Sequence, residues 1–200
     1  METTFAKGAQ QLWEYLLVAH PDDNVFNKIM DIKQDFFKTY NQKIAVKTKP
    51  HITIANFLAT ESMEETVIRW IQRVCSQHKS FPVTLNNYSG FPPHTVFVRI
   101  QDHTPFKQLA AELKVIDQYV RSNGCPEARL VFRPHLTIAK GLDNNIYNKA
   151  MLDYSQKTFH ETFLLTELIL LKRNNQFDAC KQVNVFRFYP PDTNMYNQVA

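Results

Sequence analysis

The sequence predicts an α+β protein in which the strands form mixed or antiparallel sheets. Predicted strands are separated by predicted helices, yet some neighbouring strands are joined by short turns, which a parallel pair does not allow. A doubly wound parallel sheet is disfavoured for a second reason. The chain carries no G-x-G-x-x-G or P-loop pattern, and only 4 glycines are available to build one.

The predicted strands are short apolar runs or segments in which apolar and polar residues alternate. Turn residues such as His20-Pro21 and the polar stretch 173–176 bound them. The predicted strands cover residues 13–19, 51–57, 81–88, 94–100, 135–139, 161–172 and 182–189. Residues 190–200, which begin with Pro190-Pro191, are expected to form a loose tail.

The predicted helices have apolar residues at helical spacing, and each has a start signal. In chain order, the signals are Asp23 or Asn24 for residues 24–40, a capping box of Ser62 and Glu65 for residues 63–74, Thr104-Pro105 for residues 106–120, and Asp143 for a short helix through Tyr154.

The composition is that of an ordinary folded protein. Of the 200 residues 44% are hydrophobic, and the net charge of +4 suits an anionic small substrate or a nucleic-acid end without the dense basic clusters of a duplex-binding protein. No secretory signal or run of ~20 apolar residues occurs, so we expect a cytoplasmic protein without membrane contact. The cysteines, Cys75, Cys125 and Cys180, form no C-x-x-C pair and are interpreted as reduced packing residues.

One hexapeptide occurs twice. Pro50-His51-Ile52-Thr53-Ile54-Ala55 recurs 84 residues later as Pro134-His135-Leu136-Thr137-Ile138-Ala139, with only an Ile-to-Leu exchange. Because His and Pro are not strand-forming choices, strand propensity does not explain the match. A single His-x-Thr in a strand is usually structural, but two copies in one frame indicate a duplicated helix–strand unit that carries an active site.

Alternation along a strand decides where these side chains point. His51 and Thr53 project to one face, and so do His135 and Thr137, while the aliphatic residues between them face the core. If a pseudo-twofold axis relates the two units, a phosphate between them meets two imidazoles and two hydroxyls. One imidazole takes a proton from the attacking group while the other gives one to the leaving oxygen, since the imidazole pKa lies near neutrality. The hydroxyls donate hydrogen bonds to non-bridging phosphate oxygens, and no metal or other cofactor is needed.

With these two motifs, the chain resembles the two-histidine (2H) phosphoesterase superfamily. Within it, the chain is most similar to the RNA 2′,3′-cyclic phosphodiesterase and 2′,5′ RNA ligase-like branch. The resemblance extends from the strand at Trp13 to the strand ending near Tyr189. It implies one bilobal domain over residues 1–200, with two pseudo-symmetric α+β lobes, antiparallel-rich sheets, outer helices and the motifs in the cleft between the lobes. It makes His51 and His135 the acid/base pair and Thr53 and Thr137 the phosphate-binding hydroxyls.

The resemblance also implies substrate-binding residues. Family members often carry Arg or Lys shortly after the second motif, where Lys140 stands in this sequence. It lies five residues after His135, so alternation along the strand points it to the opposite face, and it reaches the cleft only if the strand bends or ends there. The alternative is a solvated lysine at the end of the strand. Asn56 takes the equivalent place after the first motif, which leaves one lobe without a cation. Other members pack the base on an aromatic residue near the middle of the chain, and Tyr88 and Phe91 are the candidates.

The other conspicuous residues are interpreted as structural. The histidines that lack partners at metal-ligand spacing are read as surface residues: His20, His78, His94, His103 and His160. The strand aromatics read as core residues are Tyr15, Phe97, Phe186 and Phe188. For Lys172 and Arg173, which end an apolar strand, a solvated strand end is favoured over a place in the cleft.

The resemblance implies an enzyme that opens the 2′,3′-cyclic phosphate of an RNA end or a nucleotide to a 2′-phosphate. The sequence leaves alternatives open: 2′,5′ RNA ligation or 2′,5′-phosphodiesterase activity at the same site, or RNA or nucleotide binding without turnover. It does not tell which histidine is the base, and nothing in it suggests an obligate protein partner.

Overall fold

The computed structural model describes residues 11–175 and 178–191, and it confirms the predicted α+β fold. The strands are β1 (Leu12–Ala19), β2 (Ile52–Thr60), β3 (Phe81–Phe91), β4 (Thr95–Ile100), β5 (Arg129–Leu130), β6 (His135–Ala139), β7 (His160–Leu165), β8 (Glu167–Arg173) and β9 (Lys181–Arg187). The helices are α1 (Asp23–Tyr40), α2 (Ile44–Lys47), a 3-10 turn (Glu61–Met63), α3 (Glu64–Cys75), α4 (Thr104–Glu112), α5 (Lys114–Ser122) and α6 (Asn144–Ser155). Of the expected loose tail, residues 192–200 lie outside the described residues.

The strands form a nine-stranded sheet in the order β7-β3-β4-β6-β2-β1-β8-β9, with β5 also paired to β2. All pairings between these strands are antiparallel. The order is symmetric about its centre, because β2 matches β6, β1 matches β4, and β8 and β9 match β3 and β7. We call β2, β1, β8 and β9 with their helices the first lobe, and β6, β4, β3 and β7 with theirs the second lobe.

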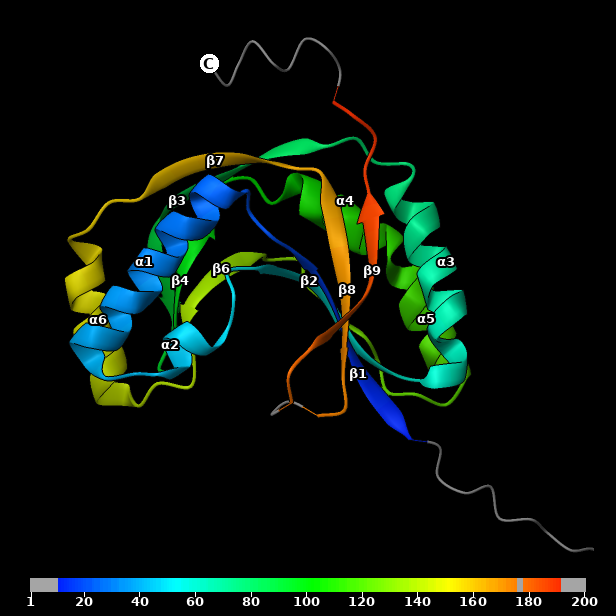
Figure 1. Cartoon of the computed structure of the whole chain (residues 1–200), viewed down its shortest axis with the longest axis horizontal. Helices are drawn as coiled ribbons and strands as arrows, with labels where there is room; N and C mark the ends of the chain where they lie inside the picture. Colours follow the sequence, from blue (N-terminus) through cyan, green and yellow to red (C-terminus); the bar gives the residue numbers. More distant parts are fainter. Residues whose placement is uncertain (1–10, 176–177, 192–200) are drawn as a thin grey trace, which may run out of the picture.

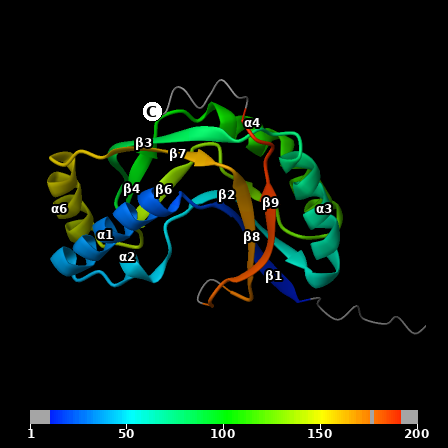
Figure 2. The ribbon, with the colours of Figure 1, turned by 45° about the horizontal axis from the view of Figure 1, so that its top comes forward.

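The helices cross between the two halves of the sequence. Helix α1 follows β1 but packs on β6 and β7, and α4 and α5 follow β4 but pack on β2. Helix α3 packs on β9, and α6 packs on β3 and β4. Figure 1 shows α1, α2 and α6 on one side and α3, α4 and α5 on the other, with the strands between them, and Figure 2 shows the same division from another angle. Each lobe therefore combines strands and helices from both copies of the repeat.

Two predicted elements are divided in the structure. The predicted helix 106–120 is interrupted at Leu113, which ends α4 and begins α5. The predicted strand 161–172 is interrupted at Thr166, so that β7 lies at the edge of the second lobe and β8 lies in the first. The carbonyl of Thr166 accepts a hydrogen bond from the Phe188 amide at this change of direction. Apolar spacing alone did not show either break.

The helix caps agree with the sequence in one case and differ in three. Thr104, expected to cap the helix that contains Pro105, is the first residue of α4, and His103 holds the N-cap position. Asp143 caps α6 as predicted, because its side chain accepts a hydrogen bond from the Ile146 amide at 2.8 Å. Helix α1 is capped by Asp22 rather than by the predicted residues 23 or 24. The predicted capping box before α3 does not form, because a 3-10 turn precedes the helix and Ser62 pairs with Thr60 instead.

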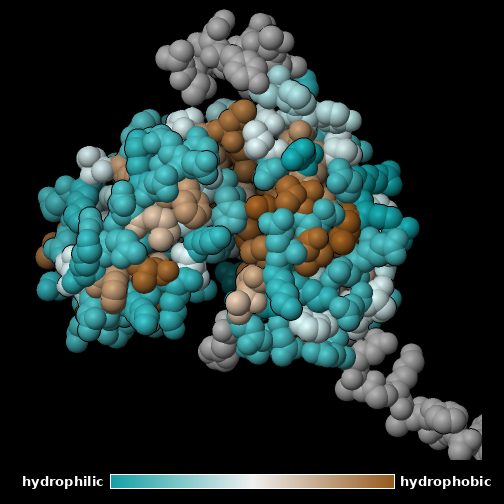
Figure 3. Space-filling model, in the orientation of Figure 1, coloured by the Kyte–Doolittle hydropathy of each residue, from teal (hydrophilic) through white to brown (hydrophobic). Residues whose placement is uncertain are grey.

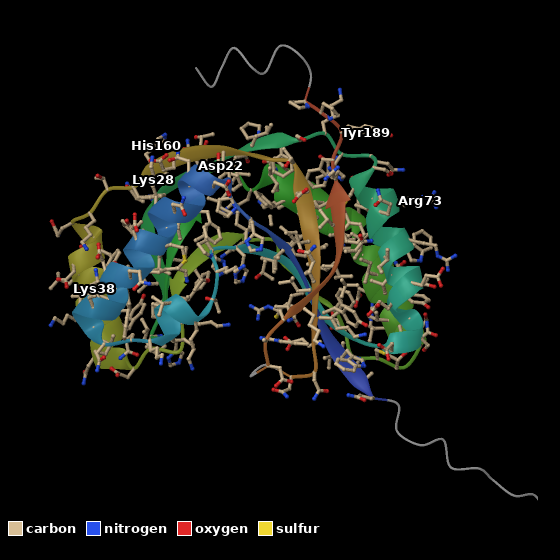
Figure 4. The ribbon with its side chains drawn as sticks, viewed as in Figure 1. Asp22, Lys28, Lys38, Arg73, His160 and Tyr189 are labelled. Atoms are coloured by element: carbon tan, nitrogen blue, oxygen red, sulfur yellow. The ribbon has the colours of Figure 1, made fainter. Side chains whose placement is uncertain are left out.

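An ion pair ties α1 to the edge of the second lobe. Lys28 Nζ lies 2.6 Å from Glu161 Oε1 on β7. Figure 4 shows Lys28 and His160 at this edge, with Lys38 farther along the same helix. Helix α1 is thus fixed to β7 through Lys28, and it also packs on β6, which carries the second motif.

Candidate active site

The two motif strands, β2 and β6, lie side by side where the lobes meet (Figures 1 and 2). Their antiparallel register pairs Ile52 with Leu136, the middle residues of the two His-x-Thr motifs. Residues that flank such a pair approach crosswise, so the histidine of each motif lies toward the threonine of the other. Both paired residues are fully buried, whereas the flanking side chains are partly exposed on the opposite face: His51, Thr53, His135 and Thr137.

Each imidazole is held in one tautomer by its own chain. Nδ1 of His51 lies 2.8 Å from the carbonyl oxygen of Lys49, and Nδ1 of His135 lies 3.1 Å from that of Arg133. Because a carbonyl oxygen only accepts, Nδ1 carries the hydrogen and the neutral ring presents an unprotonated Nε2. Neither Nε2 has a hydrogen-bond partner among the residues that the structure describes.

Burial lowers the pKa of both imidazoles below the usual histidine range. Desolvation is the main cause for His51, and nearby cations that include Lys33 and Lys140 lower its pKa further. Desolvation also leads for His135, with a smaller contribution from Arg129. The carbonyl hydrogen bonds oppose these effects without cancelling them. Both rings are therefore mainly neutral at neutral pH, while an anion between them would favour the protonated form of one.

A β-bulge follows each motif threonine. In β2 the extra residue is Ile54, because Thr53 and Ala55 on either side of it pair with the consecutive residues Val18 and Leu17 of β1. In β6 the extra residue is Ile138, in the same relation to β4. An extra residue inverts the alternation of side chains along a strand. The bulges therefore turn the positions of Asn56 and Lys140, which simple parity assigns to the core, toward the face of the histidines.

Lys140 directly follows β6 and is exposed. Its charge helps to lower the pKa of both His51 and Glu14, so it lies near these residues. Simple alternation along the strand opposed a place for Lys140 in the cleft, and the bulge at Ile138 removes this objection. The sequence did not show the bulge, because two apolar residues in succession also fit a plain buried strand.

Asn56, the counterpart of Lys140, belongs to a hydrogen-bonded network. Its Nδ2 donates to Glu14 Oε1 at 2.6 Å, and Arg173 donates to the same carboxylate through Nε at 2.6 Å and Nη2 at 2.8 Å. The bond to Arg173 is the largest cause of the lowered pKa of Glu14. The reading of Lys172 and Arg173 as a solvated strand end is therefore wrong, since Lys172 also bonds two carboxylates of the first lobe.

The structure places only one of the two candidate aromatics beside a motif histidine. The ring of Phe91 is 44% exposed, and its centroid lies 4.9 Å from that of His135 at an interplanar angle of 83°. Phe97, which is buried as predicted for a core residue, contacts His135 at the same centroid distance. Tyr88 packs instead against Tyr154, with ring centroids 4.7 Å apart, on the helix side of the sheet. Phe91 is thus available to a substrate base and Tyr88 is not.

His20 is a member of the site that sequence reasoning missed. It follows the last residue of β1, and its Nδ1 lies 2.6 Å from the carbonyl oxygen of Pro50. Its ring centroid is 6.4 Å from that of His51. The interpretation of His20 as a surface residue overlooked its neighbour, because only the pairing of β1 with β2 brings the two histidines together.

The surface is hollowed between the two lobes, as Figure 3 shows. Within residues 11–175 and 178–191, no group of three or more His, Cys, Asp or Glu side chains is placed to hold a metal ion. Cys75 and Cys125 are buried and Cys180 is exposed. No helix in the described part of the chain is long and apolar enough to cross a membrane.

Known proteins share both the sequence pattern and the fold. The family model for the 2′-5′ RNA ligase superfamily matches residues 21–177. No curated protein is similar enough in sequence to match. E. coli LigT in its apo form has 14% identity and a TM-score of 0.64, over 90% of this chain and 99% of LigT. LigT complexed with 3′-AMP has 14% identity and a TM-score of 0.63, over 88% and 98%. TT0787 of Thermus thermophilus has 12% identity and a TM-score of 0.65, over 88% and 98%.

A bilobal antiparallel fold with two His-x-Thr motifs at its centre defines a two-histidine phosphoesterase. The chain belongs to the 2′-5′ RNA ligase superfamily, the 2H phosphoesterase superfamily that its motifs indicated. The fold that it shares with LigT and TT0787 is the fold of that superfamily. Membership supports a phosphodiesterase or ligase-like role.

Proposed function

We propose that this protein is a metal-independent phosphodiesterase that opens the 2′,3′-cyclic phosphate of an RNA end or a nucleotide to a 2′-phosphate. The observation that carries the proposal is the pair of imidazoles. His51 and His135 come from equivalent positions of adjacent antiparallel strands, each with Nδ1 bound to a carbonyl and Nε2 free. This arrangement supplies a base and an acid on the two sides of one phosphate.

The reaction needs two proton transfers. The neutral imidazole removes a proton from water through Nε2 as the water oxygen bonds to phosphorus. The bond from phosphorus to the ribose 3′-oxygen breaks, and the protonated imidazole gives its proton to that oxygen. Protons then exchange with solvent to restore the starting forms. A phosphate anion raises the pKa of the imidazole that must carry the proton, which offsets the lowering by burial.

The remaining residues of the site stabilise and orient the phosphate. Thr53 and Thr137 share the face of the histidines, so their hydroxyls donate to the non-bridging oxygens, where charge develops in the transition state. Lys140 adds a positive charge near His51. Phe91 offers an exposed ring on the His135 side, on which a base can stack.

The test is hydrolysis of 2′,3′-cyclic nucleotides in the presence of EDTA, followed by separation of the 2′- and 3′-phosphate products. We expect the wild type to form the 2′-phosphate, and His51→Ala and His135→Ala to form none above background. His160→Ala is the matched control, because this exposed histidine lies at the outer edge of the second lobe (Figure 4) and should leave turnover unchanged. Turnover that requires a divalent metal, or a 3′-phosphate product, would refute the proposal.

The family description favours a second candidate, the joining of RNA ends through a 2′,5′ bond. It is related chemistry at the same site, in which a ribose hydroxyl takes the place of water or of the leaving oxygen. Incubating RNA that ends in a 2′,3′-cyclic phosphate with RNA that begins with a 5′-hydroxyl separates the two. A joined product that depends on both histidines identifies a ligase, and unjoined RNA that carries only 2′-phosphate ends identifies the hydrolase.

A further inference from the structure

Two charged side chains are buried in the described part of the chain, and they occupy equivalent positions. Lys33 on α1 is 1% exposed, and Asp117 on α5 is 8% exposed. They are 84 residues apart, which is also the spacing of the two motifs. Their helices are equivalent too, since each one crosses from its own half of the sequence to the motif strand of the other lobe.

Lys33 is bonded to the bulge of the second motif strand. Its Nζ donates to the carbonyl of Ile138 at 3.1 Å and to that of Ala45 in α2 at 2.9 Å, and it lies 3.5 Å from Thr48 Oγ1. Ile138 is the extra residue of the bulge. The Lys33 ammonium therefore joins α1, α2 and β6 at the point where Lys140 is turned toward the cleft.

In the first lobe, the carbonyl of the extra bulge residue is hydrogen-bonded without a cation. The carbonyl of Ile54, the extra residue of the other bulge, accepts a hydrogen bond from the Val131 amide at 2.9 Å. Asp117 anchors the segment that leads there, because it accepts a hydrogen bond from the Ala128 amide at 2.9 Å. At equivalent sites, the first lobe thus uses a backbone amide held by a carboxylate, and the second lobe uses a lysine.

We propose that Lys33 is a positioning residue of the phosphate site: it fixes the bulge that turns Lys140 toward the cleft, and its buried charge adds to the positive potential that a bound phosphate meets. The inference rests on the proposed function, because it requires that the cleft bind phosphate.

The surroundings of Lys33 explain why its charge matters. Its hydrogen-bond acceptors are all neutral oxygens, and no carboxylate forms an ion pair with it among the described residues. The positive charge of Lys140, at the end of β6, lowers the pKa of Lys33. The charge of Lys33 in turn lowers the pKa of His51, the residue immediately before β2. Burial, with a smaller contribution from Lys140, lowers the pKa of Lys33 to about 8. An anion in the cleft offsets the repulsion between the charges of Lys33 and Lys140, so bound phosphate should raise the pKa of Lys33. By reciprocity, protonation of Lys33 should tighten phosphate binding by the same free energy.

Two matched variants test the proposal with inorganic phosphate as the probe, titrated calorimetrically at pH 7. Lys33→Met removes the charge and the bonds to the bulge, and Asp117→Asn perturbs the equivalent site of the other lobe. Both should lower thermal stability, but only Lys33→Met should weaken phosphate binding, by roughly tenfold. Phosphate binding unchanged in Lys33→Met, or weakened equally in Asp117→Asn, would overturn the proposal. In a cycle with Lys140→Met, the losses should be less than additive, because Lys33 acts partly through Lys140.

A measurement on the unmodified chain covers the case in which Lys33→Met does not fold. With lysines labelled at Cε, NMR follows the ammonium of Lys33, whose pKa burial lowers to about 8, and saturating phosphate should move its titration upward. A titration that phosphate leaves in place would overturn the inference about Lys33 alone. Wild-type protein that binds no phosphate would overturn the proposed function with it.

Discussion

The Glu14→Gln substitution tests the hydrogen-bonded network of Glu14, Asn56 and Arg173 in the first lobe. Glu14 accepts three short hydrogen bonds, one from Asn56 and two from Arg173. A hydrogen bond to a charged group contributes about 1 kcal/mol more than a neutral one, which gives roughly 3 kcal/mol for the three. The side chains of Arg173 and Glu14 are 17% and 16% exposed, so solvent screening reduces the expected loss to about 2 kcal/mol. For a chain of this size the loss corresponds to a decrease of roughly 4–8 °C in Tm.

The loss should depend on pH with a definite sign. Arg173 lowers the pKa of Glu14 below its ordinary value of 4.5, so the folded state favours the ionised carboxylate. The stabilisation is complete above the ordinary pKa and disappears as the pH falls through the lowered one. The difference in Tm between wild type and Glu14→Gln should therefore be largest near neutral pH and should shrink in acid.

Glu167→Gln is the matched control for this experiment. Glu167 also lies on the inner strands of the first lobe, but its contact with Arg187 is 3.7 Å long and the side chains are 39% and 86% exposed. Its loss should stay within about 0.5 kcal/mol. The measurement is the Tm of wild type, Glu14→Gln and Glu167→Gln over a range of pH. If Glu14→Gln costs no more than Glu167→Gln, or if its cost does not change with pH, the account of the network is refuted.

Three further predictions concern the catalytic cleft. The pKa of His51 and that of His135 lie below the usual 6.5, so the acid limb of the plot of kcat/KM against pH should have its midpoint below pH 6.5. A midpoint above that value would contradict the burial argument. The unfolded chain takes up these protons first, so unfolding titrations should also show stability decreasing as the pH falls below 6.5. Thr53→Val and Thr137→Val should each lower kcat roughly 10- to 100-fold with intact folding by circular dichroism, since each removes a donor to the transition state; unchanged kcat would exclude the threonines. Phe91→Ala should raise KM for a cyclic nucleotide several-fold with a smaller effect on kcat, and an effect on kcat alone would exclude base stacking.

The repeated hexapeptide was enough to predict the centre of the fold from the sequence. Strand alternation placed His51 and Thr53 on one face, and the matching frame implied that the second copy does the same. The structure adds the register, in which Ile52 pairs with Leu136. That register joins strands far apart in the sequence, so it could be inferred only as a consequence of symmetry.

Features that depend on tertiary pairing could not be predicted in this way. The bulge that turns Lys140 toward the cleft has no local signature, and neither does the approach of His20 to His51. Arg173 was expected to be solvated because its partner Glu14 lies at the opposite end of the chain. Lys33 resembled any lysine of an amphipathic helix, since nothing in helix α1 shows that β6 and α2 enclose it.

The central claim is that His51 and His135 act as one acid–base pair. It is tested most directly by kcat/KM for a 2′,3′-cyclic nucleotide in EDTA, measured for wild type, His51→Ala, His135→Ala and the double variant. Residues that act as a unit have strongly non-additive effects, so each single variant should lose about as much activity as the double variant, on the order of 10³-fold or more. A single variant that keeps most of its activity, or losses that multiply in the double variant, would show that the two histidines do not work together.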